Sequence, residues 1–479
     1  MHFIDKFLKF ENKQHLFEKK IQGVYFWQYV RFTIYFDVLK QKEDISDVYA
    51  SADIKKGLLK KIFLLLKYAF LIFKKNTFLN VKQSDILVLN HARRIKNGKF
   101  YDCMYTDDLL RNIDLSYCVI ENSYNGVHLI PTRTKNLYYT DALFVLRVLR
   151  RGLFSFFNIY KIDEDEAKYI TYLVKEINKI FDVNISEKYI LNKIQYAILN
   201  YKATYKYYEK IINIVNPKVI LELVSYDMEN MIFNEIAKKR NIPIIELQHG
   251  TMGKYHVAYN FYKKVDLLAF PDYLFVFGNF WKKTTRLPIK EDDIKVVGFP
   301  YFEKRINDTY KSSHIDEKKN IVFISQLVIG SSLSKFARDV SEKIDCNKYR
   351  IIYKLHPSEY ENWREMYPWL NTDTIKVIDN NEKDIYFFLK NAEYQIGCFS
   401  TAIFEGFGFY LKTFIYKTYG SEYMEDLCKN GYAKIVSNSD ELIKLLDDKN
   451  NDHYFKGEIW QFGALLNMRN ELKKIINNH

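Results

Sequence analysis

From residue 85 onward the chain alternates short apolar runs with longer segments whose apolar positions recur at helical spacing. Short β-rich runs separated by amphipathic helices are typical of parallel α/β architecture. The predicted strands are residues 86–89, 116–120, 219–223, 244–247, 274–277, 295–297, 321–324, 350–354, 394–396, 413–416 and 433–436, and helices are predicted at 228–240, 334–343 and 440–446.

The most polar break in this alternation is NDTYKSSHIDEKKN at residues 307–320, and it predicts a domain boundary. The expected organisation is a helical N-terminal extension over 1–80, a Rossmann-like domain over 81–306, and a second Rossmann-like domain over 307–479 with a C-terminal helix. Two such domains facing a cleft would form a site for a nucleotide-linked ligand, because ligands bind at the carboxyl ends of parallel strands.

One segment of the extension, KKGLLKKIFLLLKYAFLIFKK at residues 55–75, bears on membranes. Its apolar run, 62–73, contains Lys67 and is too short to cross a bilayer. The flanking lysines fit an interfacial helix on anionic lipid, and a core helix with solvated ends is the alternative. The chain start lacks the apolar core of a signal peptide. The expected location is the cytoplasm, with peripheral contact to the inner face of the plasma membrane as an option.

Composition narrows the class of partner. The 479 residues are 48% hydrophobic and 27% charged, so the chain is globular, and its net charge of +13 favours anionic partners. The lysines are scattered, and we find neither zinc-finger spacing nor an Arg-rich tail, so nucleic acid is disfavoured. Five widely spaced cysteines indicate no disulfide framework and suit a reducing cytoplasm.

The first candidate motif is IIELQHGT at residues 244–251, where an apolar strand enters a polar turn. It places His249 at the carboxyl end of a strand, beside Gly250, Gly253 and Lys254. These are the groups that a general base and an anion contact require. A structural histidine in a turn is the alternative, and the flanking glycines favour the functional interpretation.

The second motif is IIYKLHPSE at residues 351–359. Lys354 and His356 are two residues apart at the end of a predicted strand, so their side chains point to the same side. Pro357 fixes the local backbone. Two donors on one side suit a diphosphate or a nucleotide monophosphate, and an ordinary strand-terminating proline is the alternative.

The third motif is GCFSTAIFEG at residues 397–406, where a strand gives way to an apolar helix start. Ser400 or Thr401 would cap that helix, whose free N–H groups can bind phosphate. Glu405, one turn further on, could accept a hydrogen bond from a ribose hydroxyl. A plain N-cap is the alternative.

The basic segment 91–99 follows the first clear strand and should also face the cleft. Its Arg93, Arg94 and Lys99, together with Lys254, suit an acidic or phosphorylated acceptor, and a solvated basic loop is the alternative. Asp227 follows another strand and is a rival to His249 for the role of catalytic base, although an Asp at a helix start is commonly a cap.

The order of these motifs, with VGFP at residues 297–300 between the first and second, resembles the GT-B transferases of bacterial capsule, teichoic acid and lipopolysaccharide synthesis. The CDP-glycerol glycerophosphotransferase-like enzymes are nearest in pattern, and bacterial sialyltransferases and Kdo transferases share the His-Pro and Ser/Thr motifs that contact a CMP-linked donor. The resemblance covers roughly residues 219–437. It implies that His249 lies at the reacting centre and that the donor nucleotide is held by Lys354, His356, Ser400, Thr401 and Glu405.

The chain departs from the glycerophosphotransferase pattern in three places. Gln248 stands where an aromatic residue usually precedes His-Gly, Met252-Gly253 replaces Pro-Leu, and the stretch after Gly298 lacks the usual Arg and Asp. These departures put glycerol phosphate in doubt as the transferred group and leave the fold unaffected.

The sequence therefore predicts a GT-B-like glycosyltransferase of capsule or lipopolysaccharide synthesis that moves a sugar from a nucleotide, with CMP or CDP favoured, to a glycan or lipid-linked acceptor. We expect no metal, because Asp163-Glu164-Asp165 opens a helical segment, and no cofactor, because neither a phosphate-binding loop nor a dinucleotide fingerprint occurs. The alternatives are a CDP-glycerol or CDP-ribitol-type transferase, a sugar-nucleotide epimerase and a non-catalytic assembly scaffold.

Overall fold

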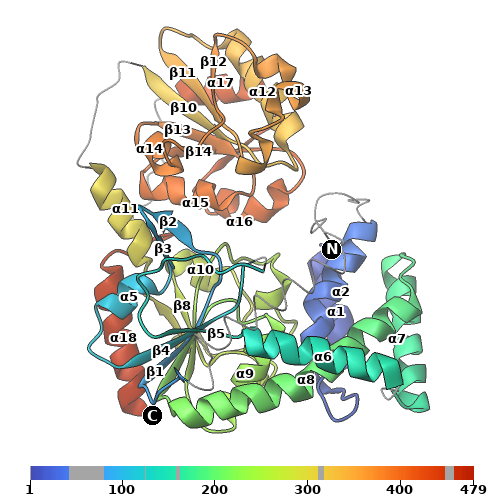
Figure 1. The fold of residues 1–479 in the computed structure, drawn as a ribbon. Helices are drawn as coiled ribbons and strands as arrows, with labels where there is room; N and C mark the ends of the chain where they lie inside the picture. The colour runs from blue at the N-terminus through green and yellow to red at the C-terminus, as the bar shows by residue number, and fades with distance from the viewer. Residues whose placement is uncertain (1, 43–79, 125, 158–161, 311–317, 448–457) are drawn as a thin grey trace.

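The computed structural model describes residues 2–42, 80–124, 126–157, 162–310, 318–447 and 458–479. They form two α/β domains, drawn one above the other in Figure 1, with a group of helices beside the lower domain. The segment 55–75, with its predicted interfacial helix, lies outside the described residues. None of the helices within the described ranges combines the length and the apolar character needed to cross a bilayer.

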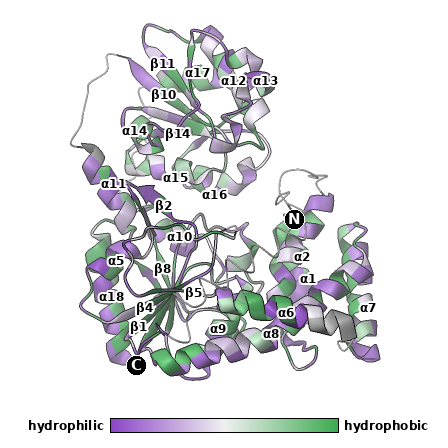
Figure 2. Ribbon diagram, viewed as in Figure 1, coloured by the Kyte–Doolittle hydropathy of each residue, from purple (hydrophilic) through white to green (hydrophobic). Residues whose placement is uncertain are grey.

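The first domain is built on a seven-stranded parallel sheet in the order β5-β4-β1-β6-β7-β8-β9. Its central strands are buried on both faces, as a parallel sheet covered by helices requires (green strands in Figure 2). The strands are β1 Ile86–Asn90, β4 Tyr117–Glu121, β5 Leu137–Tyr139, β6 Val219–Glu222, β7 Ile244–Leu247, β8 Tyr273–Val276 and β9 Ile294–Val296, and a separate antiparallel hairpin joins β2 Ile95–Asn97 to β3 Phe100–Asp102.

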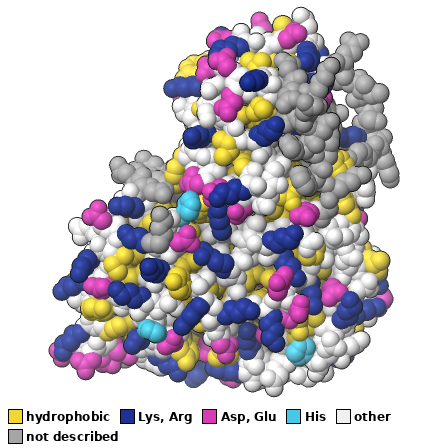
Figure 3. All heavy atoms as spheres, turned by 180° about the vertical axis from the view of Figure 1, so that it is seen from behind, with side chains coloured by type: hydrophobic (Ala, Val, Ile, Leu, Met, Phe, Trp, Pro, Cys, Tyr) yellow, Lys and Arg dark blue, Asp and Glu magenta, His cyan; other side chains and the backbone are white. Residues whose placement is uncertain are grey.

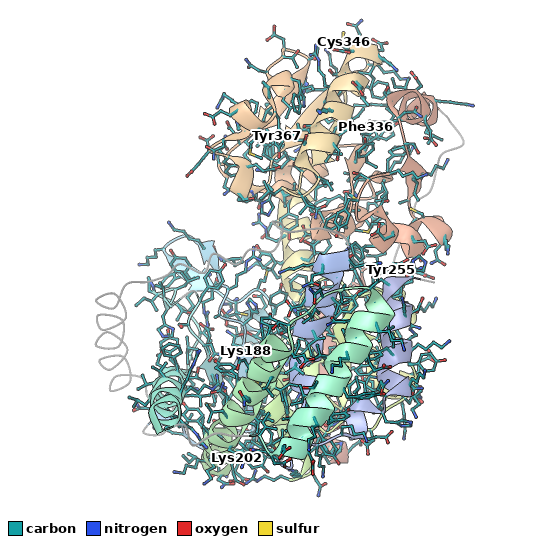
Figure 4. The ribbon with its side chains drawn as sticks, turned by 90° about the vertical axis from the view of Figure 1, so that its right-hand side faces the viewer. Lys188, Lys202, Tyr255, Phe336, Cys346 and Tyr367 are labelled. Carbon is teal, nitrogen blue, oxygen red and sulfur yellow. The ribbon has the colours of Figure 1, made fainter. Side chains whose placement is uncertain are left out.

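Helices cover this sheet and enlarge the domain on one side, where α7 and α8 run next to each other (Figure 4). The N-terminal pair α1 and α2 packs its apolar residues into the same core, and a buried ion pair, Arg31 Nε to Glu11 Oε1 at 2.6 Å, joins the two helices. The helices are α1 Phe3–Lys13, α2 Trp27–Lys42, α5 Asp107–Arg111, α6 Asp141–Phe157, α7 Glu164–Phe181, α8 Glu187–Val215, α9 Met228–Lys238, α10 Asn279–Lys283 and α11 Pro300–Tyr310.

The second domain is a six-stranded parallel sheet in the order β12-β11-β10-β13-β14-β15. Its strands are β10 Lys319–Ile324, β11 Tyr349–Lys354, β12 Ile375–Ile378, β13 Tyr394–Gly397, β14 Lys412–Tyr416 and β15 Lys434–Val436. Its helices are α12 Gly330–Lys343, α13 Trp363–Met366, α14 Ile385–Lys390, α15 Thr401–Gly408, α16 Glu425–Lys429 and α17 Ser439–Asp447.

After the second sheet the chain returns to the first domain. Residues 458–463 cross the junction, and α18, Ala464–Asn478, packs its apolar side beside β1 and β8 (red helix in Figure 1). Trp281 Nε1 donates to the Ile459 carbonyl at 2.9 Å, and Trp460 Nε1 donates to the Phe404 carbonyl of α15 at 2.7 Å. The returning segment therefore contacts both domains.

Two glycines of the first domain permit this crossing. A Cβ on Gly278 would lie 2.4 Å from the Glu458 carbonyl oxygen, and one on Gly298 would lie 2.1 Å from the Gln461 carbonyl oxygen. Gly298 also has a φ of +92°, which other residues rarely adopt. The glycine of the Val-Gly-Phe-Pro motif is thus required by backbone contact.

The predicted fold class is confirmed: the protein is α/β, with two Rossmann-type parallel sheets and helical N-terminal segments. Each predicted strand is present. The strands absent from the prediction are the outermost pair, β5 and β12, and the hairpin β2–β3. Asp163 caps α7 by accepting a hydrogen bond from the Glu166 N–H at 2.8 Å, as predicted for a helix start.

We expect Gly298→Ala to lower the free energy of unfolding by about 2 kcal/mol or more, since the new methyl group meets the Gln461 carbonyl and the backbone is left-handed. Urea titration followed by tryptophan fluorescence measures this change. Gly152→Ala is the matched control, because Gly152 lies in α6 with open space around it, and it should change stability by less than about 1 kcal/mol. Equal midpoints for the two variants would contradict the required contact.

Candidate active site between the two domains

A cavity of about 360 Å³ lies between the domains. The first domain contributes the loop after β1, the turn after β7 and a group of aromatic rings, and the second contributes the start of α15. The lining residues are His91, Arg93, Ile95, Met104, Tyr105, His249, Gly250, Thr251, Phe277, Trp281, Phe299, Thr401, Phe404, Glu405 and Trp460.

His249 enters the cavity from the end of β7, as the first motif predicts. Buried Gln248 shapes the turn: its Nε2 donates to the Gly250 carbonyl at 2.9 Å, and its Oε1 accepts from the Phe277 N–H at 2.8 Å. Tyr105 Oη donates to the His249 carbonyl at 2.6 Å. Gln248 therefore links the ends of β7 and β8 through the two hydrogen bonds of its amide, which an aromatic side chain could not form.

The imidazole of His249 is uncharged at neutral pH. Burial lowers the pKa of His249 to about 3, and the nearby His256 and His91 act in the same direction. Tyr226 Oη lies 3.3 Å from Nε2. A neutral ring has the free lone pair that a general base needs, but a pKa of about 3 makes it a weak base unless a nearby negative charge raises that pKa.

The start of α15 faces His249 from the second domain. Ser400 is the N-cap, its Oγ accepting from the Ala402 N–H at 3.3 Å, and Thr401 in the first turn is exposed and lines the cavity. Gln326 Oε1 accepts from the Phe399 N–H at 3.2 Å and fixes the chain just before the cap. The arrangement directs the N–H groups of a helix start toward the junction between the domains, where a phosphate can bind.

Glu405 lies one turn further along α15 and lines the same cavity. Its Oε1 accepts a hydrogen bond from Tyr386 Oη at 3.0 Å. Burial raises the pKa of Glu405 to about 7, and the Tyr386 hydrogen bond opposes this rise. The carboxyl can therefore donate or accept a hydrogen bond near neutral pH.

Lys354 and His356 lie at the edge of the second sheet from which α15 starts, because β11 and β13 both pair in parallel with β10. Parallel strands two positions apart are separated by about 10 Å. Lys354 and His356 are not among the residues that line the cavity. Lys354 Nζ donates to Tyr360 Oη and to the Asn380 carbonyl, and burial lowers its pKa to about 8.

A capping box holds His356 in place. The His356 N–H donates to Glu359 Oε2 at 2.7 Å, and His356 Nδ1 accepts from the Ser358 N–H at 3.2 Å. The first turn after Pro357 is thereby fixed, and the ring of His356 remains exposed.

The four basic residues expected at the acceptor side are separated in the fold. Arg93 is exposed and lines the cavity. Arg94 is buried, with Nη2 2.6 Å from Glu121 Oε2, so its guanidinium is committed within the first domain. Lys99 is exposed at the β2–β3 turn.

Lys254 reaches the second domain instead, where it pairs with Glu425 at 2.5 Å and Asp426 at 3.1 Å. Its neighbour Tyr255, labelled at the junction of the domains in Figure 4, donates to Glu425 at 2.9 Å. Asp227, the rival base, is the N-cap of α9 and accepts from the Glu229 N–H at 2.8 Å. It is not among the cavity-lining residues.

An aromatic wall completes the cavity, and sequence inspection did not identify it. Phe277 stacks on Phe299 with centroids 4.8 Å apart and on Trp460 at 5.1 Å, and Trp281 lies 4.6 Å from Phe404. The rings come from distant parts of the chain. The signal available in the sequence was the aromatic run after β8, FVFGNFW at residues 275–281.

Charged groups elsewhere on the surface are dispersed. On the face shown in Figure 3, Lys and Arg side chains are spread over both domains with acidic ones among them. No group of three or more His, Cys, Asp or Glu side chains placed to hold a metal ion occurs in the ranges that the structure describes.

Neither a protein-family model nor a curated protein matches the sequence significantly. Among solved structures, the UDP-GlcNAc 2-epimerase of Methanocaldococcus jannaschii is 13% identical, with 82% of this chain and 99% of that chain covered and a TM-score of 0.49. A putative UDP-N-acetylglucosamine 2-epimerase of Listeria monocytogenes is 12% identical over 82% and 98% of the two chains, with a TM-score of 0.48. The wall teichoic acid polymerase TagF is 12% identical over 88% and 99%, with a TM-score of 0.43.

The fold is GT-B-like. Two Rossmann-type parallel sheets face a shared cavity, and the final helix returns to the first domain. At 12–13% identity the similarities to solved structures do not transfer the role of any residue.

Glu405→Gln tests the buried carboxyl. Because the pKa of Glu405 is about 7 in the folded protein against 4.5 for the free side chain, ionising it costs folding free energy as the pH rises from about 4.5 to 7. Neutral Gln avoids this cost. We therefore expect the free energy of unfolding of the variant minus that of the unmodified chain to increase by about 1–2 kcal/mol from pH 5 to pH 8. Urea titration at the two pH values measures this difference.

Glu425→Gln is the matched control. Hydrogen bonds from Lys254, Lys429 and Tyr255 lower the pKa of Glu425 from 4.5 to about 2, so its stabilising contribution is lost as the pH falls from about 4.5 to about 2. Its difference from the unmodified chain should be equal at pH 5 and pH 8. A Glu405→Gln difference that is also equal at the two values would show that Glu405 is charged throughout.

Proposed function

We propose that this protein is a metal-independent glycosyltransferase of bacterial surface polysaccharide synthesis, transferring a sugar from a CMP- or CDP-linked donor to a glycan or lipid-linked acceptor. The observation that carries the proposal is one cavity lined by a neutral imidazole, His249, from the first domain and by a helix start, Thr401, from the second. A base on one side and an anion site on the other are what group transfer from a phosphate requires.

The donor nucleotide is assigned to the second domain. The N–H groups at the start of α15 and the Ser400 and Thr401 hydroxyls would bind its phosphate, and Glu405 would accept from a ribose hydroxyl. Lys354 and His356 follow β11 at the same sheet edge and would add donors to a diphosphate. The aromatic wall offers flat apolar surface for the base or the sugar.

The acceptor is assigned to the first domain. Arg93 lines the cavity and remains exposed, so it is the basic side chain placed to contact an acidic or phosphorylated acceptor. His249 is a better candidate for the catalytic base than Asp227, because the carboxylate of Asp227 caps α9. The lysine-flanked apolar segment at 55–75 supports work at an anionic membrane surface.

In the proposed step His249 Nε2 removes the proton from an acceptor hydroxyl as that oxygen bonds to the anomeric carbon of the sugar. The bond between this carbon and the nucleotide phosphate oxygen breaks, and its electron pair leaves with the phosphate. Hydrogen-bond donors at the α15 start stabilise the added negative charge. The imidazolium then releases its proton to solvent.

His249→Gln should reduce kcat for transfer by about 10²–10⁴-fold, because an amide at this position cannot take the proton of the acceptor hydroxyl. Affinity for CMP, CDP and UDP, measured by calorimetry on the full chain, should change by less than about twofold, since the nucleotide is assigned to the other domain. His15→Gln, at an exposed histidine that does not line the cavity, is the matched control and should retain full transfer.

A donor panel that includes CDP-glycerol and UDP-linked sugars identifies the transferred group by the rise in melting temperature. If His249→Gln retained full transfer activity on a confirmed donor and acceptor pair, His249 would not be the catalytic base. Failure of every nucleotide to bind the unmodified chain would favour the non-catalytic scaffold.

A sugar-nucleotide epimerase is the second candidate, and Glu405 is the observation that favours it. A carboxyl with a pKa of about 7 shares the cavity with a neutral imidazole, so two groups can exchange protons with one bound sugar. If the protein is a transferase, donor consumption without acceptor should be negligible. Proton NMR of the sugar nucleotide measures this consumption. Conversion of the donor to an equilibrium mixture with a stereoisomer in the absence of acceptor would instead establish the epimerase.

A further inference from the structure

The two nitrogens of His249 have different surroundings. Nδ1 is enclosed by protein and has no hydrogen-bond partner, whereas Nε2 lies 3.3 Å from Tyr226 Oη. The side chain as a whole keeps 16% of its surface exposed. Because Nδ1 is enclosed, a ligand in the cavity can reach the ring through Nε2 only. A polar atom left unpaired in the interior is costly, so Nδ1 calls for a partner.

The side chain nearest to Nδ1 among the acids is Glu246, three residues earlier on β7. Its Oε1 is 3.8 Å from His249 Nδ1, and its Oε2 is enclosed and also without a hydrogen-bond partner. An approach of about 1 Å converts this contact into a hydrogen bond. The carboxyl of Glu246 thus lies beside the unpaired Nδ1, and one of its two oxygens, Oε2, still lacks a donor.

Other groups hold Glu246 in place. Tyr259 Oη donates to Glu246 Oε1 at 2.6 Å, and the Ser225 N–H donates to the same oxygen at 3.1 Å. Ser225 is presented by a left-handed Val224, with a φ of +61°, whose carbonyl is bound by Asn230 Nδ2. A β-branched residue rarely adopts this conformation, so the turn is maintained by its surroundings.

The charge on Glu246 follows from its neighbour across the sheet. Glu222 of β6 is in register with Glu246, and both carboxyls are fully buried. Two adjacent buried carboxyls do not both ionise. Burial and the nearby Glu246 raise the pKa of Glu222 well above its usual value. Burial also raises the pKa of Glu246, and the hydrogen bonds from Tyr259 and Ser225 oppose this rise. Glu246 is therefore the member of the pair that ionises more readily.

We propose that Glu246 is the positioning residue of His249: it accepts a hydrogen bond from Nδ1–H and so fixes the tautomer in which Nε2 presents its lone pair to the cavity. The carboxylate also stabilises the imidazolium formed when Nε2 takes a proton, and this second role rests on the proposed function. The tautomer itself does not depend on the reaction catalysed. Tyr226 would give up its contact with Nε2 to the acceptor hydroxyl.

The tautomer can be read directly by nitrogen-15 NMR of the full chain labelled at histidine. The chain has ten histidines, and His249→Gln identifies the His249 signals by their loss. In the unmodified protein at pH 7 we expect His249 to carry its proton on Nδ1. A proton found on Nε2 would overturn the proposal, and this measurement needs no variant of Glu246 to fold.

Glu246→Gln removes the charge at constant shape, and Glu222→Gln is the matched control. The control changes a buried carboxyl on the adjacent strand that hydrogen-bonds Asn234 at 2.7 Å. In Glu246→Gln we expect the Nδ1 proton preference to be lost and kcat to fall about 10²-fold with donor KM within twofold. In Glu222→Gln the tautomer and kcat should be retained.

The outcomes separate the two proposals. Loss of the tautomer in both variants, or in neither, would overturn the role of Glu246 whatever the activity. The expected tautomer result combined with full transfer by Glu246→Gln would support Glu246 as the partner of His249 and remove His249 from the catalytic role.

Discussion

The return of the chain across the domain junction is the contact on which the site depends. The indole N–H groups of Trp281 and Trp460 bind the returning segment and α15, respectively, so one short stretch ties the aromatic edge of the first domain to the helix that starts at Thr401. Because Gly278 and Gly298 have no side chain, this stretch lies directly on the backbone that follows β8 and β9. The same contacts form the back wall of the cavity, so the separation of His249 from α15 is set by packing.

The central parts of both sheets could be predicted from the sequence because a parallel strand buried on both faces is a continuous apolar run. In the two main sheets the missed strands are edge strands: β5 has three residues, and the two middle positions of β12 are not buried, with Lys376 facing solvent. The hairpin β2–β3 was also missed, because each of its strands has three residues and few of them are buried. The position of α18 could not be predicted, since a helical pattern does not say which domain its apolar side will cover. The Val-Gly-Phe-Pro motif likewise has a structural reason, contact with Gln461, that becomes visible only in the fold.

The candidate site divides in the same way. The turns after β7, β11 and β13 were predicted to meet, because ligand sites form at the carboxyl ends of parallel strands. His249 and Thr401 do share a cavity, whereas Lys354 and His356 are not among its lining residues. The local sequence pattern could not predict which basic side chains would form ion pairs within the protein. Arg94 pairs with a residue 27 positions away and Lys254 with one 171 positions away, so a positive charge in the sequence did not identify a cation open to a ligand.

The electrostatics of the cavity connect these observations. Of the side chains that line it, Arg93 is the one Lys or Arg, while His249 is neutral and Glu405 has a pKa of about 7. The side chains of the cavity therefore contribute little fixed charge, and a phosphate bound there would supply the dominant field. A negative charge beside a neutral imidazole raises the pKa of that imidazole, because it favours the protonated form. His249 would then become more basic when an anionic donor is bound, and a carboxylate at Glu246 acts on the ring in the same direction from the enclosed side.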